Sequence, residues 1–136
     1  MDVKKILVSG LAAGVAIFII SAVFGVIVQL IAPYNVLALG GMRAIDEPIM
    51  TLFFLYPFVI SFAMAIAYEF VKESFQGDYV QKGYTFGLLV WLVAGLTSAF
   101  IVLVNMNYPI GFTLDSTLGS LLYTIGAGIV IAKLQN

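Results

Sequence analysis

Six polar residues that could bind a ligand lie in two connecting segments of the chain. One segment joins the first long apolar run to the second, and the other joins the third to the fourth. The six residues are Arg43, Asp46, Glu47, Asn105, Asn107 and Asp115. Carboxylate and amide oxygens bind cations, and a guanidinium group pairs with an anionic headgroup, so these residues are candidates for an outer-face polar site. A structural interpretation competes: Asp46 and Glu47 place negative charge at a helix start, with Arg43 as their partner. Asp115 then caps the following helix.

Hydroxyl groups inside the apolar runs form a second set of candidates. They belong to Ser61, Thr97 and Ser98. Hydroxyls and backbone carbonyls can line a pore through a membrane. The alternative is that each hydroxyl bonds to the backbone of its own helix or of a neighbouring helix.

Chemistry that requires a thiol or an imidazole is excluded, because the chain has no Cys and no His. Disulfides, thiolate nucleophiles, cysteine zinc sites and the commonest haem ligand are therefore absent. The chain has neither a Gly-x-Ser-x-Gly nucleophile turn nor a glycine loop for phosphate. The sequence predicts no catalytic, cofactor-binding or metal-binding residues, and nothing in it indicates an enzyme.

The composition requires an apolar environment around the protein. Of the 136 residues, 62% are hydrophobic and 10% are charged, whereas soluble proteins have about 45–50% apolar and about 25% charged residues. A small soluble domain cannot bury so much apolar surface, but a lipid bilayer solvates it. The net charge of −1 comes without a clustered basic surface, so no nucleic-acid partner is expected.

Four apolar runs are long enough to be membrane-spanning helices, which need about 20 residues each. The predicted spans are Ile6–Ile31, Pro48–Tyr68, Gly83–Val104 and Ser116–Ala132. No Asp, Glu, Lys or Arg lies within these bounds, which argues against a conventional proton-coupled carrier. The predicted fold class is an all-α membrane protein: a four-transmembrane-helix bundle in one domain, residues 1–136.

Basic residues are distributed unequally over the two sides of this bundle. One side carries Lys4, Lys5, Lys72, Lys82 and Lys133, and the other carries only Arg43. Cytoplasmic loops of membrane proteins have an excess of Lys and Arg. We therefore expect a multi-pass protein of the cytoplasmic membrane with both termini in the cytoplasm.

Small residues form a matched stripe on the first and third spans. The stripe residues are Gly10, Gly14, Ser21 and Gly25 in the first span, and Gly83, Gly87, Ala94 and Ser98 in the third. Each set lies on one helix face, and such faces let helix backbones approach closely. We predict the tightest helix contacts here, either between these two spans or with the second and fourth spans. The matched spacing also fits a weak repeat of two helical hairpins, with packing alone as the alternative.

Two classes of function remain open from the sequence. The favoured one is a non-catalytic bundle that acts through association in the membrane, as a subunit, scaffold or regulator. The alternative is a small oligomeric transporter or channel for a solute or an ion, since four helices alone enclose little room. The expected partners are the lipid bilayer and a second copy or another membrane protein. No motif identifies a substrate.

Overall fold

The computed structural model describes residues 1–136 as an all-helical chain without strands. Four of its helices are long and apolar enough to cross a membrane, as the sequence predicts. We refer to these as the first to fourth long helices, and they run Val3–Ile31, Pro48–Ser74, Tyr79–Asn105 and Ile110–Gln135.

The first long helix is α-helical throughout, whereas the other three change helix type along their length. The first is α1 (Val3–Ile31). The second consists of the 3-10 segment η2 (Pro48–Leu55), α2 (Tyr56–Val71) and the 3-10 turn η3 (Lys72–Ser74). The third consists of α3 (Tyr79–Val90), the π-helical segment η4 (Trp91–Leu96) and α4 (Thr97–Asn105). The fourth consists of α5 (Ile110–Leu114), the π-helical segment η5 (Asp115–Gly119) and α6 (Ser120–Gln135). A short 3-10 turn, η1 (Val36–Ala38), lies in the long loop between the first two.

Two helix starts are fixed by carboxylate caps. The Asp2 side chain accepts a hydrogen bond from the backbone N–H of Lys5 at 3.2 Å, at the start of α1. At the start of α3, the Asp78 carboxylate accepts from the Gln81 N–H at 2.9 Å, and the Gln81 side chain accepts from the Asp78 N–H at 3.2 Å. This reciprocal pair satisfies backbone donors that a helix start otherwise leaves without partners.

The fourth long helix begins at Ile110 and not at the predicted Ser116. Pro109 occupies the boundary, where its fixed φ and missing N–H suit a helix start. Asp115 lies inside the helix as the first residue of η5. The interpretation of Asp115 as a helix cap is therefore wrong, and an ionisable residue lies within a membrane-length helix.

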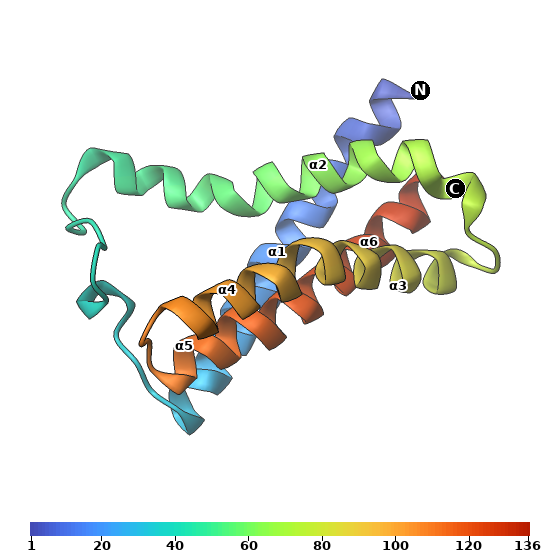
Figure 1. Ribbon diagram of the computed structural model, residues 1–136. Coiled ribbons are helices and arrows are strands. Elements are labelled where there is room, and N and C mark those ends of the chain that lie inside the picture. Colours follow the sequence, from blue (N-terminus) through green and yellow to red (C-terminus); the bar gives the residue numbers. More distant parts are fainter.

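The long helices lie side by side in the order second, first, fourth, third. α1 packs against α2 and against α6, and α3 packs against α6. Figure 1 shows both chain termini at one end of the bundle, beside the loop that joins α2 to α3. We call this the termini end, and we call the opposite end, with the loop of residues 32–47, the long-loop end. The second and third long helices are the outer members of this order.

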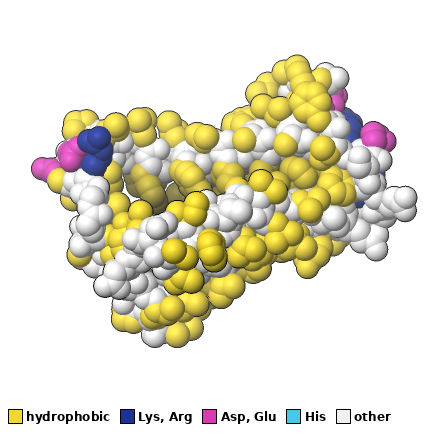
Figure 2. All heavy atoms as spheres, viewed as in Figure 1, with side chains coloured by type: hydrophobic (Ala, Val, Ile, Leu, Met, Phe, Trp, Pro, Cys, Tyr) yellow, Lys and Arg dark blue, Asp and Glu magenta, His cyan; other side chains and the backbone are white.

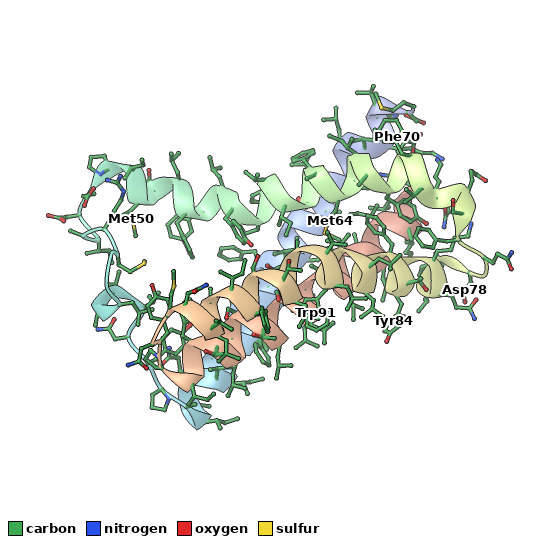
Figure 3. All side chains as sticks on the ribbon, in the orientation of Figure 1. Met50, Met64, Phe70, Asp78, Tyr84 and Trp91 are labelled. Atoms are coloured by element: carbon green, nitrogen blue, oxygen red, sulfur yellow. The ribbon has the colours of Figure 1, made fainter.

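The buried core lies mainly toward the termini end, where aromatic rings fill the space between the second and third long helices. The rings of Tyr68, Phe75 and Phe86 pack there with centroids 5.1 to 6.3 Å apart. The buried amide of Gln135 donates to the Ser9 hydroxyl at 2.8 Å and to the Ala65 carbonyl at 3.0 Å, which ties α6 to α1 and α2. Figure 3 shows Met64 of α2 pointing into the bundle and Phe70 pointing away from it. This end of the bundle is therefore closed.

The sides of the molecule are apolar and its charges lie at the two ends. Figure 2 shows hydrophobic side chains over the flanks, with the Lys, Arg, Asp and Glu side chains of this face gathered near the long-loop and termini ends. Large side chains such as Phe70 and Val93 are each 75% exposed on these flanks. An apolar belt between two charged ends is the surface that a bilayer-spanning protein presents to lipid.

Candidate binding cavity

A cavity of about 750 Å³ lies toward the long-loop end of the bundle. The second long helix diverges from the third there, as Figure 1 shows. All four long helices line the cavity, together with Tyr34 and Val36 of the long loop. It extends inward to Ile60 and Val90, near the middle of the second and third long helices. Figure 2 shows it as a hollow that opens on the side of the molecule.

The cavity wall is mainly apolar with a few hydroxyl groups. Phe18, Ile60 and Val90 contribute to its apolar surface, and Tyr56 and Tyr123 bring in phenols from the second and fourth long helices. The two phenol oxygens lie 3.1 Å apart and share a hydrogen bond. A mainly apolar wall with a few placed polar groups is typical of small-molecule sites.

Asp115 is the only charged residue in the cavity wall. Its side chain is half-buried, and its Oδ2 atom accepts a hydrogen bond of 2.7 Å from the Tyr34 hydroxyl. The two ion pairs of the molecule, Arg43 with Glu47 and Lys72 with Glu69, do not include it. Asp115 is therefore a carboxylate in a mainly apolar wall without a cationic partner in the protein.

Tyr34 is held in place by the helix that precedes it. The Gln29 side chain donates to the Tyr34 carbonyl at 2.9 Å and accepts from the Tyr34 N–H at 3.2 Å. Gly111 lets the loop pass close to α5, because a Cβ at this position would overlap the Ala32 carbonyl. Burial raises the pKa of the Tyr34 phenol, and the hydrogen bond to Asp115 and its negative charge raise it further.

Both π-helical segments border the cavity. η4 contributes Gly95, and η5 contributes Asp115 and Ser116. The Trp91 indole N–H donates to the Thr117 carbonyl at 3.0 Å and to the Ser120 hydroxyl at 3.1 Å, which joins the two segments. Single π-helical turns inside helices occur frequently at functional sites.

In each matched stripe, the small residues of the first half pack against a neighbouring helix. Those of the second half line the cavity or lie beside Asp115 of its wall. Gly10 and Gly14 face the rings of Phe62 and Phe58 in α2, each 2.5 Å from where a Cβ would be. In the third long helix, a Cβ on Gly83 or Gly87 would overlap the α6 backbone. The second halves behave differently, since Ser21, Ala94 and Ser98 line the cavity and Gly25 lies next to Asp115. The first and third long helices therefore use their stripes against the second and fourth, and not against each other.

The six residues of the predicted outer-face polar site do not share a hydrogen-bond network. Arg43 is exposed and pairs at 2.7 Å with Glu47, which is half-buried. Asn105 donates to the Ile101 carbonyl of its own helix at 3.0 Å, and Asp46 and Asn107 are exposed. Asp115 alone reaches the cavity.

The three candidate lumen hydroxyls have different surroundings. Ser61 is buried and donates to the Phe58 carbonyl at 3.0 Å. Thr97 is exposed and donates to the Val93 and Ala94 carbonyls. Only Ser98 lines the cavity.

A second recess of about 590 Å³ opens at the termini end. Its charged residues are Lys72, Glu73, Asp78, Lys82 and Lys133. Lys72 already pairs with Glu69 at 2.9 Å, and Lys133 lies over the Tyr79 ring at 5.6 Å. Because the acidic and basic side chains largely offset one another, this recess selects neither sign of charge.

Three tyrosines of the cavity wall were not indicated as site residues by the sequence. Tyr34, Tyr56 and Tyr123 have no spacing that distinguishes them from aromatic residues at a membrane interface. Pro109 was the available signal for Asp115, since a proline that starts a helix places the carboxylate inside it. No family model, curated protein or solved structure matches the chain.

Proposed function

We propose that the protein is a membrane-embedded carrier or receptor that binds a mainly apolar small molecule in the cavity at its long-loop end. The observation that supports this is the cavity itself, about 750 Å³ and lined by all four long helices. Small-molecule sites typically have volumes of about 300–1,000 Å³ and mainly apolar walls. The hollow on the side of the molecule lets an apolar ligand enter from the lipid (Figure 2).

The closed termini end favours a carrier or receptor over a channel. The aromatic rings of Tyr68, Phe75 and Phe86 pack together between the second and third long helices at this end. A channel needs a continuous polar path, whereas a binding site needs access from one side only. The cavity opens toward the long-loop end, where its charged residue Asp115 and the Tyr34 phenol lie.

The distribution of basic residues supports an orientation with the long-loop end outside the cell. Lys72, Lys82 and Lys133 lie at the termini end with Lys4 and Lys5, and Arg43 lies at the other. By the positive-inside rule, this distribution supports termini in the cytoplasm and a cavity in the outer leaflet. Labelling of single cysteines at positions 43 and 76 by an impermeant maleimide tests this, because only position 43 should react in intact cells.

A bundle that acts through association alone is the second candidate function. It is favoured by the exposed flank of the third long helix, where Val93 is 75% and Phe100 is 65% exposed. A second copy or another membrane protein on this flank would cover it. In this second function, the exposed flank would be the contact surface and the cavity would have no role.

Photolabelling distinguishes the two functions. A long-chain alcohol that carries a diazirine is irradiated with the protein in lipid nanodiscs, and the adducts are mapped by mass spectrometry. We expect adducts on cavity residues such as Phe18 and Tyr123 in excess over the exposed Val93 on the same bundle. Ser98→Trp fills the cavity and should remove that excess, whereas the matched control Val93→Trp should keep it. Adducts spread evenly over all exposed apolar residues would reject the binding function.

A further inference from the structure

Asp115 is a charged residue in a cavity wall that is otherwise mainly apolar. The carboxylate uses Oδ2 to accept from Tyr34 at 2.7 Å, and Oδ1 accepts no hydrogen bond from the protein. Oδ1 is not fully buried, and its residue belongs to the cavity wall. One oxygen is therefore positioned by the protein and the other is available to a ligand.

No cation of the protein is placed to neutralise this carboxylate. Arg43, the only basic residue at the long-loop end, pairs with Glu47 at 2.7 Å. The lysines belong to the termini end, as the charged recess there shows for Lys72, Lys82 and Lys133. Because an isolated carboxylate is expensive to keep in apolar surroundings, a cationic ligand gains binding free energy from it.

Aromatic rings beside Asp115 add to the attraction for an organic cation. Tyr34 and Phe112 both line the cavity and pack edge to face with centroids 5.8 Å apart. Aromatic faces attract ammonium groups, most strongly where water is excluded. A metal ion is disfavoured, because no group of three His, Cys, Asp or Glu side chains exists in the protein to hold one and hard cations require several oxygen ligands.

We propose that Asp115 and Tyr34 form the headgroup subsite of the cavity, and that the ligand is an amphiphile with an ammonium group on an apolar body. The ammonium group contacts Oδ1 of Asp115, and the apolar body extends along Phe18 and Ile60 toward the closed end of the cavity. This inference rests on the proposed binding function and specifies the ligand class for it. Anionic amphiphiles are excluded by repulsion from the same carboxylate.

A matched pair of photoreactive probes tests the headgroup subsite. One probe has a trimethylammonium head on a diazirine-bearing alkyl chain, and the other has the neutral tert-butyl head of the same shape. Both are irradiated with the full chain in nanodiscs of zwitterionic lipid, and adducts on cavity residues are quantified. We expect the cationic probe to label the wild-type cavity about tenfold more than the neutral one, because only the cationic head forms an ion pair with Asp115.

Variants separate the charge from the fold. Asp115→Asn keeps the acceptor for Tyr34 and should reduce labelling by the cationic probe to the neutral level, without changing labelling by the neutral probe. Unchanged labelling by the neutral probe shows that the loss in the Asn variant is not misfolding, and Asp115→Glu, which retains the charge, should retain most of the preference. Asp46→Asn removes an exposed acid at the same end of the bundle and should change nothing.

Two kinds of result would overturn the headgroup subsite or the proposed function. Equal labelling by the two probes, or a preference that survives in Asp115→Asn, overturns the headgroup subsite while the neutral probe still supports the proposed cavity function. Failure of both probes to label the wild-type cavity rejects the proposed function and the subsite together.

Discussion

Asp115 and Tyr34 couple the long loop to the fourth long helix. The phenol donates to the carboxylate at 2.7 Å, and the Gln29 side chain holds the Tyr34 backbone against α1. The cavity wall thus contains a carboxylate that is positioned by a loop residue and accessible to a ligand. Loss of the Tyr34 hydroxyl should loosen the loop without removing the charge.

The stability that Tyr34 contributes should depend on pH. Its pKa is raised above the usual value by burial first and by Asp115 second. For a raised pKa, the stabilisation is present below the unfolded pKa of about 10 and is lost as pH rises toward the folded value. At pH 8, Tyr34→Phe should lower the free energy of unfolding by about 1 kcal/mol, the typical net contribution of a hydrogen bond. Thermal unfolding of both proteins in detergent at pH 8 and pH 11 should show this difference shrinking, and a difference independent of pH would contradict it.

At the residue scale, the sequence identified Asp115 as a binding candidate but assigned the wrong local structure. Asp is a good helix cap, and this preference suggested a start at Ser116. Pro109 begins the helix earlier, so Asp115 lies within η5. Its contact with Tyr34 joins residues 81 positions apart, and such contacts depend on how the helices pack.

Small residues act differently in the two halves of each stripe. Gly83 and Gly87 of α3 lie against the α6 backbone, whereas Gly25 of α1 has open space around it except for Asp115 at 3.9 Å from an ideal Cβ. The stripes were predictable because their spacing places them on one helix face. The helices that pack against the stripes were not predictable, because small residues allow any neighbouring helix to approach closely. The π-helical segments were equally unpredictable, since they coincide with tertiary contacts such as that of Trp91 with Thr117.

Gly→Ala substitutions should separate glycines that pack against a helix backbone, such as Gly87, from Gly25, which has no close neighbour. In Gly87→Ala the new Cβ overlaps the Thr124 carbonyl, so α3 and α6 must move apart at a cost of about 1–3 kcal/mol, as for other overpacked sites. Gly25→Ala meets only an ordinary contact and should be neutral or stabilising by about 0.5–1 kcal/mol through helix propensity. Thermal unfolding in detergent measures both. Equal stability of the two variants would show that α3 and α6 are not in close backbone contact at Gly87.

At the scale of the whole molecule, the order of the helices creates the cavity. The second and third long helices are the outer members of the order and pack together only near Tyr68, Phe75 and Phe86. The sequence predicted four apolar helices, because hydropathy and length depend on each segment alone. It did not predict the cavity, which depends on the angle between helices that are far apart in the sequence.

Cysteine protection tests whether this cavity binds a ligand. The chain has no native Cys, so Ser98→Cys places one thiol in the cavity wall and Val93→Cys places one on the exposed flank of the same long helix. Alkylation by N-ethylmaleimide in nanodiscs is measured with and without the trimethylammonium amphiphile. At a probe concentration of about ten times its Kd, we expect about tenfold slower alkylation at position 98 and an unchanged rate at position 93. Equal rates with and without the probe at position 98, or equal slowing at both positions, would contradict it.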